Sequence, residues 1–311
     1  MTVSSELINW KSTGDYISFG PHNHLIFVKQ LGEQNASVEK TLLLLHGFPE
    51  SSFSYHAVVD ALLKVFDRII LFDMLGYGWS DKPLDDYSYS LMEQANSAFV
   101  VWRHFGIEGG HLLAHDMGNS VATEILARHE SDLMPHWFSE GLQSLTLTNG
   151  SIVLSLAKLR FTQKLLLTRY GHLMGYVVNY KLFRHQVRSA HGNDNLSDAE
   201  IRLLWESNTI QDGVKRSHHT IKYIKDRRQF EKTRWLPALA QTKLPVHLCW
   251  GDEDAVARVE MAYYLKENIC KEATLTIMKG LGHFGQLGSP ERWAAHVCGF
   301  YLHLHSKNNT A

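Results

Sequence analysis

Residues 113–120 read Leu-Ala-His-Asp-Met-Gly-Asn-Ser, and this stretch decides the fold class. Just upstream, 110–114 is short and apolar enough to be a buried strand, and just downstream, 121–127 has the apolar spacing of a helix. A strand, a tight turn and a helix in this order are the setting of a nucleophile elbow. Asp116 stands at the tip, and Gly118 lets the turn pack closely. The stretch therefore predicts a carboxylate nucleophile that attacks carbon and forms an alkyl ester.

Apolar runs recur along the rest of the chain, with helical segments such as 91–105 between them. Continuous apolar strands are typical of a parallel sheet covered on both faces, and their alternation with helices favours a doubly wound, mostly parallel α/β sheet. We expect an opening antiparallel pair at 16–19 and 25–29, followed by strands at 41–45, 68–72, 111–114, 145–147, 246–250 and 274–278. Polar clusters follow these strands, at the edge where such sheets carry their functional residues.

One region, from about 151 to 235, interrupts this alternation with a purely helical pattern. The spacing predicts helices over 154–170 and 174–187, a loop at 192–195, and a further helix capped by Ser197. The stretch 215–234 is rich in Lys, Arg and His, which we interpret as a solvated helical face rather than a nucleic-acid patch. We therefore predict a helical lid over 151–235, inserted in an α/β core formed by 1–150 and 236–311.

Composition sets broad limits on the class of protein. The 311 residues are 44% hydrophobic and 20% charged, so the chain can bury a sizeable core. A formal net charge of −1 gives no electrostatic reason to expect nucleic acid or anionic membranes as partners. Three cysteines are too few for a disulfide framework, and we find neither a signal-peptide pattern nor an apolar run that would span a membrane. These features favour a cytoplasmic protein and leave its oligomeric state open.

An ester on Asp116 needs a base that activates water, and histidine is suited to this because its pKa lies near neutral pH. The chain has nineteen histidines, but His283 follows the last predicted strand. Asp254 follows the strand at 246–250 and is placed to orient that imidazole. Nucleophile, acid and histidine then occur in the order of this hydrolase architecture. Asp252 and Glu253 are rivals for the acid, which we interpret as turn residues.

The oxyanion formed on the ester needs backbone donors. One is the amide of Met117, directly after the nucleophile, and the other is the amide of Phe48 in the loop 46–49 after the strand at 41–45. His46 and His115 flank the site, and we interpret both as structural or orienting residues. Ser120 lies one helical turn beyond the tip, so we do not expect it to act as a nucleophile.

Several motifs resemble one branch of the α/β-hydrolase superfamily, the aspartate-nucleophile epoxide hydrolases and haloalkane dehalogenases. They are the segments 46–51 (HGFPES), 73–83 (DMLGYGWSDKP) and 115–118 (HDMG). The resemblance covers nearly the whole chain and implies the α/β-hydrolase fold. Segments 147–150 (LTNG) and 223–230 (YIKDRRQF) are most similar to the mesoderm-specific-transcript-type hydrolases.

The resemblance also implies how the leaving group is stabilised. A dehalogenase usually has tryptophan directly after the nucleophile and often Asn or Glu in the oxyanion loop, where this chain has Met117 and Phe48. Met117 is atypical for epoxide hydrolases as well. Those enzymes protonate the epoxide oxygen through lid tyrosines. Tyr223 matches one such position, and Tyr180 is the second candidate, with Tyr176 behind it; the alternative is that these are packing residues of an amphipathic lid.

Together these observations predict hydrolysis of an epoxide to a diol through an ester on Asp116, with an apolar small molecule and water as partners. The mechanism requires neither a metal nor an organic cofactor. One alternative is a dehalogenase-like hydrolase that releases halide. Another, from a different class, is a protein of the same fold that binds a small molecule without turning it over.

Overall fold

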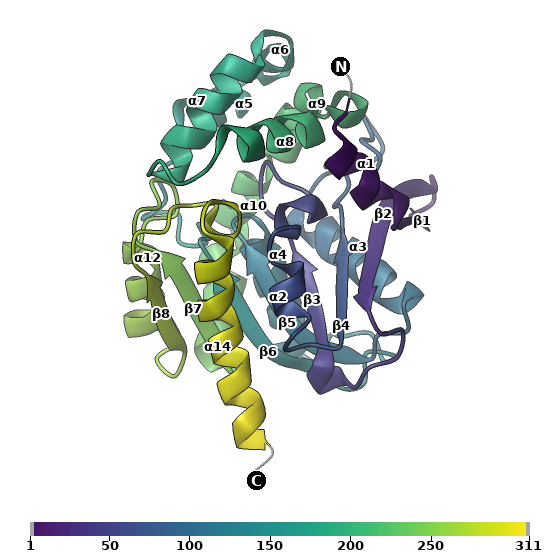
Figure 1. Ribbon diagram of the computed structural model, residues 1–311, viewed down its shortest axis with the longest axis vertical. Helices are drawn as coiled ribbons and strands as arrows, with labels where there is room; N and C mark the ends of the chain where they lie inside the picture. The colour runs from purple at the N-terminus through teal and green to yellow at the C-terminus, as the bar shows by residue number, and fades with distance from the viewer. Residues whose placement is uncertain (1–2, 309–311) are drawn as a thin grey trace.

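One eight-stranded sheet organises the molecule (Figure 1), for which the computed structural model describes residues 3–308. The strand order is β1-β2-β4-β3-β5-β6-β7-β8. The strands are β1 (Asp15–Phe19), β2 (His24–Gly32), β3 (Thr41–Leu45), β4 (Arg68–Phe72), β5 (Gly109–His115), β6 (Gly141–Thr148), β7 (Val246–Gly251) and β8 (Thr274–Met278). β2 is antiparallel to both β1 and β4, and the other neighbours are parallel. The predicted mostly parallel sheet and its opening antiparallel pair are confirmed.

Two groups of helices cover the two faces of the sheet. On one face α14 packs against α2, and on the other α4 packs against α3 and α11. The helices and helical turns outside residues 151–235 are α1 (Ser5–Ser12), η1 (Val38–Lys40), η2 (Ser52–Tyr55), α2 (Val59–Leu62), α3 (Leu91–His104), α4 (Gly118–Glu130), α11 (Leu236–Gln241), α12 (Glu260–Tyr264), η5 (Leu265–Ile269), α13 (Gly285–Gly288) and α14 (Pro290–Asn308).

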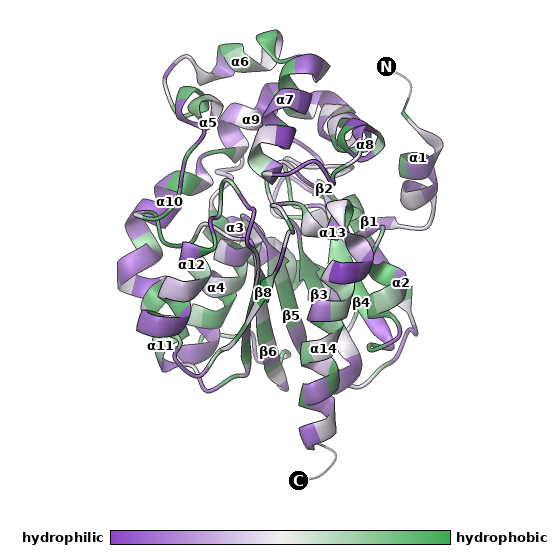
Figure 2. Cartoon of the chain, turned by 60° about the vertical axis from the view of Figure 1, so that its left-hand side comes forward, coloured by the Kyte–Doolittle hydropathy of each residue, from purple (hydrophilic) through white to green (hydrophobic). Residues whose placement is uncertain are grey.

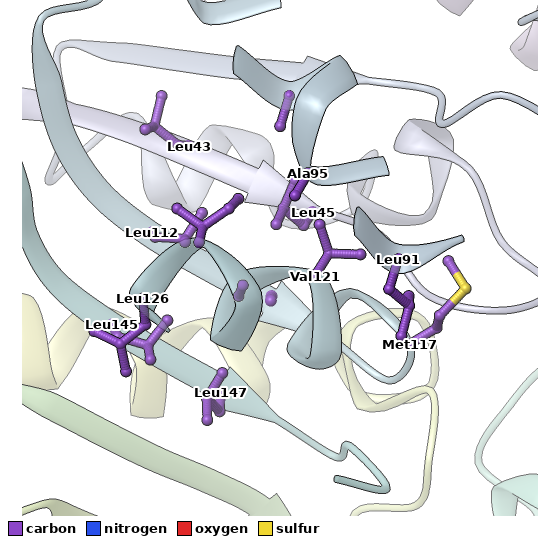
Figure 3. Close-up of a cluster of buried hydrophobic side chains, with 14 of the residues drawn as sticks. Leu43, Leu45, Leu91, Ala95, Leu112, Met117, Val121, Leu126, Leu145 and Leu147 are labelled. Atoms are coloured by element: carbon purple, nitrogen blue, oxygen red, sulfur yellow. The ribbon is translucent and has the colours of Figure 1, made fainter. Parts of the chain in front are cut away.

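Strand β3 is leucine at every position after Thr41 because both of its faces are buried. In β3, Leu43 and Leu45 join the apolar cluster on the α3 and α4 side (Figure 3), whereas Leu42 and Leu44 join the cluster on the α2 and α14 side. Successive side chains of a strand point to opposite faces, so a strand covered on both faces contains no polar positions.

Strand register brings the polar strand ends together. Leu45 of β3 is paired with Ala114 of β5, and His115 of β5 is paired with Thr148 of β6. The residues that follow these strands therefore lie side by side at the carboxyl edge of the sheet, where α/β sheets place their ligands.

Only helices lie between β6 and β7, and Figure 1 shows those from α5 to α9 above the carboxyl ends of the strands. We refer to residues 151–235 as the helical insert; they correspond to the proposed lid. Its elements are α5 (Phe161–Leu166), α6 (Gly171–Val177), α7 (Tyr180–His191), α8 (Asp198–Thr209), η3 (Ile210–Asp212), α9 (Gly213–Thr220), α10 (Tyr223–Phe230) and the π-helical turn η4 (Glu231–Trp235).

Two predicted helices of the insert are wrong in extent. The helix expected over 154–170 is confined to Phe161–Leu166, because the chain before it is held in turns: the Leu154 amide donates to the Glu231 carboxylate. The helix expected over 174–187 is divided at Asn179, which is extended and accepts a hydrogen bond from the Leu182 amide as the N-cap of α7. Asn is strongly preferred at such caps, and here the cap outweighs the apolar periodicity. Ser197 caps α8 as predicted.

No helix within residues 3–308 has the length and apolar character needed to cross a lipid bilayer.

Candidate active site

The turn after β5 holds Asp116 in a backbone conformation that few side chains adopt. Its φ is 44°, in the left-handed region, and α4 begins two residues later at Gly118. A Cβ on Gly118 would lie 2.6 Å from the carbonyl oxygens of both Leu45 and His46, so only glycine fits there. Strained backbone at a functional position persists only where the surrounding packing enforces it. The sharp turn thus presents Asp116 at the carboxyl edge of the sheet.

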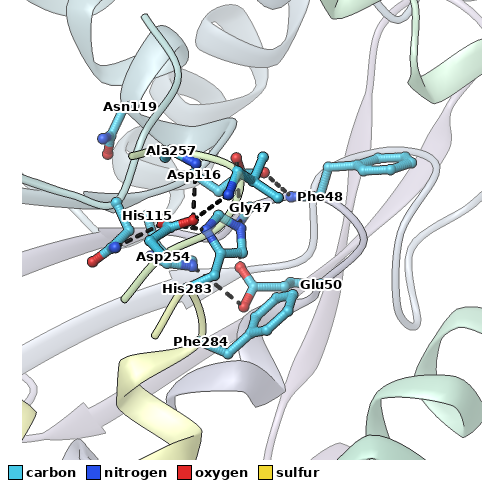
Figure 4. Close-up of polar contacts among 12 residues, drawn as sticks. Gly47, Phe48, Glu50, His115, Asp116, Asn119, Asp254, Ala257, His283 and Phe284 are labelled. Atoms are coloured by element: carbon cyan, nitrogen blue, oxygen red, sulfur yellow. Dashed lines mark hydrogen bonds and ion pairs between the residues drawn. The ribbon is translucent and has the colours of Figure 1, made fainter. Parts of the chain in front are cut away.

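The Asp116 carboxylate has two different neighbours, one for each oxygen (Figure 4). The amide of Phe48 donates to Oδ2 at 3.0 Å, and Nε2 of His283 lies 3.9 Å from Oδ1. Gly47 permits this approach of the loop, since a Cβ there would lie 2.7 Å from the Cβ of Asp116. The peptide bond between Phe48 and Pro49 is cis. The arrangement fixes one carboxylate oxygen and leaves the other facing the imidazole.

Asp254 holds the opposite edge of the His283 ring. Its Oδ2 lies 2.7 Å from Nδ1 of His283, and its Oδ1 accepts from the amides of Val256 and Ala257 at 2.7 and 2.8 Å. Burial alone would lower the pKa of His283, but Asp254, followed by Asp116 and Glu50, raises that pKa to about 9. The resting imidazole is therefore cationic at neutral pH and lies between two carboxylates.

Of the two rivals for the acid, Asp252 points away from the imidazole. Its Oδ1 accepts from the amide of Gly280 at 2.7 Å, and its Oδ2 lies 3.4 Å from Nζ of Lys279. It closes the turn beside β8, which is the turn role expected of it.

Asn149 is a site residue that the sequence analysis missed. Its Nδ2 donates to Oδ2 of Asp254 at 2.7 Å, and its Oδ1 accepts from the amide of Gly251 at 3.2 Å. Its φ is 45°, a region that asparagine tolerates better than most residues. Asn149 therefore fixes the carboxylate that orients His283. The signal was the Asn-Gly pair that directly follows β6.

Glu50 is the second missed residue, and it is buried beside the nucleophile. Its Oε2 accepts from the amide of Gly47, and its Oε1 accepts from Nε2 of Gln286, both at 2.9 Å. Burial, and then the charge of Asp116, raise its pKa to about 8, although His283 acts in the opposite direction. At neutral pH the Glu50 carboxyl is therefore largely protonated. Its position within the HGFPES segment was visible in the sequence but suggested no role.

The two flanking histidines are neutral and connect loops. Nε2 of His46 accepts from the amide of Met74 at 3.0 Å, and burial lowers its pKa. Nδ1 of His115 lies 3.1 Å from Oγ1 of Thr148, and its pKa is held well below the usual range by burial and by the nearby charge of His283. A ring nitrogen that accepts from a backbone amide carries no proton, so His46 orients the loops without carrying charge.

The structure brings Tyr223 to the site but not Tyr180. Tyr223 is buried, and its ring centroid lies 5.8 Å from that of Phe48. Burial and the charge of Asp116 raise its pKa, so the phenol stays protonated. The hydroxyl of Tyr180 instead points to the carbonyl of Asp198 at 3.5 Å, with the Arg202 guanidinium over its ring. Expecting Tyr180 at the site was wrong, because its side of α7 packs against α8.

Met117 and Ser120, which follow Asp116 in the turn and in α4, both make side-chain contacts with buried neighbours. Sδ of Met117 lies 3.3 Å from the hydroxyl of Tyr77, which donates to it. Burial, followed by the proximity of Tyr223 and then of Asp116, raises the pKa of Tyr77, so a second protonated phenol adjoins the site. Oγ of Ser120 accepts from Nε of Arg227 at 2.8 Å, away from the tip of the turn.

A cavity of about 890 Å³ lies between the insert and the sheet, and it reaches Asp116 and His283. Its walls are mainly apolar, with a few polar side chains, as is typical of small-molecule sites. The apolar lining residues are Phe48, Pro49, Leu166, Met174, Val178, Phe183, Val187, Ala190, Val214, Val256 and Phe284. Gln163 is among its polar lining residues, and hydrogen bonding to Gln163 lowers the pKa of Tyr223. Tyr223 therefore adjoins the cavity at its Phe48 and Gln163 side. Within residues 3–308 no cluster of His, Cys, Asp and Glu could hold a metal ion.

Comparison with known proteins identifies the family to which this chain belongs. The family model described as alpha/beta hydrolase fold matches residues 40–290. A putative hydrolase, LipZ, from Mycobacterium tuberculosis is 36% identical over 255 residues, covering 82% of this chain and 85% of LipZ. The human mesoderm-specific transcript homolog protein is 28% identical over 304 residues, covering 96% of this chain and 88% of that protein.

The fold also agrees with solved structures. A haloalkane dehalogenase, the DbeA-M1 loop variant from Bradyrhizobium elkanii, superposes with a TM-score of 0.74 at 19% identity, covering 96% of this chain and 98% of that one. At this identity the likeness concerns the fold alone. With a mostly parallel eight-stranded sheet and a family match over most of its length, the chain belongs to the α/β hydrolase fold family.

Proposed function

We propose that this hydrolase opens epoxides through a covalent ester on Asp116. The observation that carries the proposal is the pairing at the elbow: a carboxylate at the tip, held by the Phe48 amide at 3.0 Å, with His283 at 3.9 Å on its other oxygen. A carboxylate in that position attacks carbon, because a free carboxylate is a nucleophile at neutral pH without a separate base.

In the first step, Oδ1 of Asp116 attacks an epoxide carbon, and the carbon–oxygen bond of the ring breaks. The opening oxygen needs a proton, which we assign to the phenol of Tyr223 because Asp116 and burial keep it protonated. Tyr77 is the second buried phenol near Asp116; turned away from Sδ of Met117, its hydroxyl is the second donor that we assign to the same oxygen, in place of Tyr180.

Ester formation changes the charge around His283. An ester is neutral, so the imidazolium loses one of the carboxylates that raise its pKa and releases its Nε2 proton. That proton restores the phenol of Tyr223, which gave its own proton to the epoxide oxygen. The neutral imidazole then accepts a proton from water, while Asp254 holds its orientation.

In the second step, the resulting hydroxide attacks the ester carbonyl of Asp116. The amides of Phe48 and Met117 stabilise the oxyanion, and collapse of the intermediate releases a diol that takes its proton from His283. Asp116 emerges as a carboxylic acid and returns its proton to His283, which restores the resting pair. One oxygen of Asp116 is then derived from water.

Halide release is the second chemistry open to a nucleophilic carboxylate. In the dehalogenases that this chain resembles, a tryptophan directly after the nucleophile usually donates a hydrogen bond to the departing halide. No tryptophan is among the cavity-lining residues of the described chain, and Met117 has no donor to offer at the position after the nucleophile. These two features favour the epoxide over the haloalkane.

The test is to trap the ester with His283→Gln, which retains the nucleophile but lacks the base. The purified variant is incubated with an epoxide panel and a haloalkane panel and its intact mass is measured. An epoxide adds its whole mass, whereas a haloalkane adds its mass less the hydrogen halide, so the increment identifies the chemistry. Peptide mapping should place the adduct on Asp116.

The matched control is the double variant Asp116→Asn with His283→Gln, which should acquire no adduct. An adduct on another residue, or one that persists in the double variant, would refute the mechanism. A haloalkane-type increment would replace the epoxide with the halide reaction. Failure of both panels to give an adduct or product would favour a non-catalytic binding protein.

A further inference from the structure

The charge of this chain is distributed unevenly. From 141 to 193 the sequence contains no Asp or Glu. Over the same stretch it has seven lysines and arginines, namely Lys158, Arg160, Lys164, Arg169, Lys181, Arg184 and Arg188. The net charge of the whole chain is −1, so other regions must balance this excess. A near-neutral total therefore conceals a strongly basic first half of the helical insert.

Exposed apolar side chains gather in the same stretch. Of the thirteen large hydrophobic side chains exposed within the described chain, five lie on α5, on α6 or in the turn between them: Phe161, Tyr170, Leu173, Tyr176 and Val177. Phe161 is 78% exposed and Tyr176 is 73% exposed, the highest values of the set. Figure 2 shows α6 at the outer end of the insert, away from the sheet, and α5 below it at the side of the insert. A concentration of exposed apolar side chains marks an interaction surface.

Basic groups border these apolar side chains. The Arg169 guanidinium lies 4.6 Å from the Tyr170 ring, and Nζ of Lys215 lies 5.8 Å from the Tyr176 ring. A surface hollow of about 530 Å³ adjoins α6, and its polar lining consists of Thr168, Arg169, His172, His218, Lys222 and Lys225. The neighbouring carboxylates are engaged elsewhere: Asp198 pairs with Arg184 and Arg188, and Asp212 pairs with Lys215.

We propose that α5 and α6, with their basic border, dock on the surface of an anionic phospholipid membrane. Exposed aromatic and aliphatic side chains enter the headgroup boundary of a bilayer, and lysines and arginines around them attract anionic lipids. The described chain has no helix able to span a bilayer, so this attachment is peripheral. We call the five exposed apolar residues and the cations Lys164, Arg169, Lys222 and Lys225 the docking surface.

A second copy of the chain fits this surface poorly. In a symmetric dimer the same patch contacts itself, and a patch without carboxylates would place like charges opposite each other. An anionic bilayer offers both a complementary charge and an apolar layer.

The docking surface lies directly outside the catalytic cavity. Leu166 of α5 and Met174 of α6 line that cavity from within, while Phe161 and Tyr176 of the same helices face outward. A docked molecule would hold its cavity against the bilayer, so that an apolar substrate dissolved in lipid could pass to Asp116. Docking does not depend on the chemistry at Asp116, so the two proposals can fail separately.

The test is binding of the purified chain to phosphatidylcholine vesicles with and without phosphatidylserine, measured by co-sedimentation at low and high salt. We expect binding that requires phosphatidylserine and weakens with salt. The triple variant F161S/Y176S/V177S and the double variant K164E/R169E should each lower the partition coefficient at least about tenfold. Each removed cation loses attraction to anionic lipid, and each removed apolar group loses burial in the bilayer.

Matched controls alter the same residue types elsewhere. Two double variants, L133S/L302S and K243E/K271E, change exposed residues of the same types and should bind the vesicles like the wild type. Asp116→Asn should also bind like the wild type, which separates docking from catalysis. Absence of binding to the anionic vesicles, or unchanged binding by both docking-surface variants, would overturn the proposal. So would a dimer in sedimentation velocity that dissociates only in those variants, because it would assign the surface to a second copy.

Discussion

The charge of Asp116 should control the protonation of His283, and Asp116→Asn tests this directly. The imidazole lies 2.7 Å from Asp254 and 3.9 Å from Asp116, and its pKa is about 9 although it is buried. Replacing the Asp116 carboxylate with an amide of nearly the same shape removes one negative charge and little else. We expect the pKa of His283 to fall.

The distance sets the size of that fall. Two unit charges about 4 Å apart interact by about 4 kcal/mol at an effective dielectric constant of about 20, which corresponds to an upper limit of roughly 3 pKa units. Glu50 reduces this value, because the Asp116 charge also raises the pKa of Glu50, and without it Glu50 ionises and restores part of the field. The expected net fall is therefore about 1–2 units.

The assay is NMR titration of protein labelled at the histidine rings, with His283→Gln used to assign the resonance. Asp252→Asn is the matched control, since that carboxylate belongs to the same loop as Asp254 but faces Gly280, and it should leave the His283 pKa unchanged. Adding Glu50→Gln to Asp116→Asn should lower the pKa further. If the pKa of His283 were the same or higher in Asp116→Asn, the proposal that loss of the Asp116 charge releases the His283 proton would be refuted.

Four other outcomes follow from the same contacts. The pKa of Glu50 is about 8 in the folded protein and 4.5 in the unfolded chain, so the free energy of unfolding falls as pH rises between these two values. The limiting slope of this fall is about 1.4 kcal/mol per pH unit, and Glu50→Gln should flatten it in urea unfolding measured at several pH values. Gly118→Ala should cost about 2–3 kcal/mol in the same assay, because its Cβ meets two carbonyl oxygens at 2.6 Å; a neutral effect would contradict the tight turn. Asn149→Ala should lower the free energy of unfolding by about 2 kcal/mol and slow turnover, because Asp254 loses one hydrogen-bond donor. Unchanged stability and turnover would show that Asn149 is not part of the site. Tyr223→Phe should slow ester formation at least about tenfold in rapid-mixing experiments while Tyr180→Phe leaves it unchanged, and equal rates in both would exclude Tyr223 as the acid.

Local sequence was sufficient for the sheet and for the order of the catalytic groups. Strands β3 and β4 begin and end as predicted, because a strand buried on both faces is apolar without interruption and stops at the first polar residue. The elbow was recognisable because Gly118 and Asp116 occupy fixed positions relative to the strand end. The roles of Asp116, His283 and Asp254 stay proposals, although the structure brings the three side chains into contact distance.

The insert was harder to predict, since its helices are short and amphipathic and several of their faces are covered by other segments. The division at Asn179 follows from one capping hydrogen bond that competes with the apolar period of the whole stretch. Tyr180 and Tyr223 are both tyrosines in amphipathic segments of the insert. The direction of the Tyr180 side chain depends on which neighbour α7 packs against, and this is not visible in the sequence.

The sequence by itself determined the parallel sheet, the aspartate at the turn after β5 and the chain order of Asp116, Asp254 and His283, because each depends on residues that are adjacent along the chain. Tertiary structure decided that Glu50 and Asn149 join the site, that Tyr180 does not, and that apolar side chains of α5 and α6 are exposed next to basic groups. These relations join residues that are far apart in the chain or fix the side of a helix that faces solvent, and only packing sets such distances and directions.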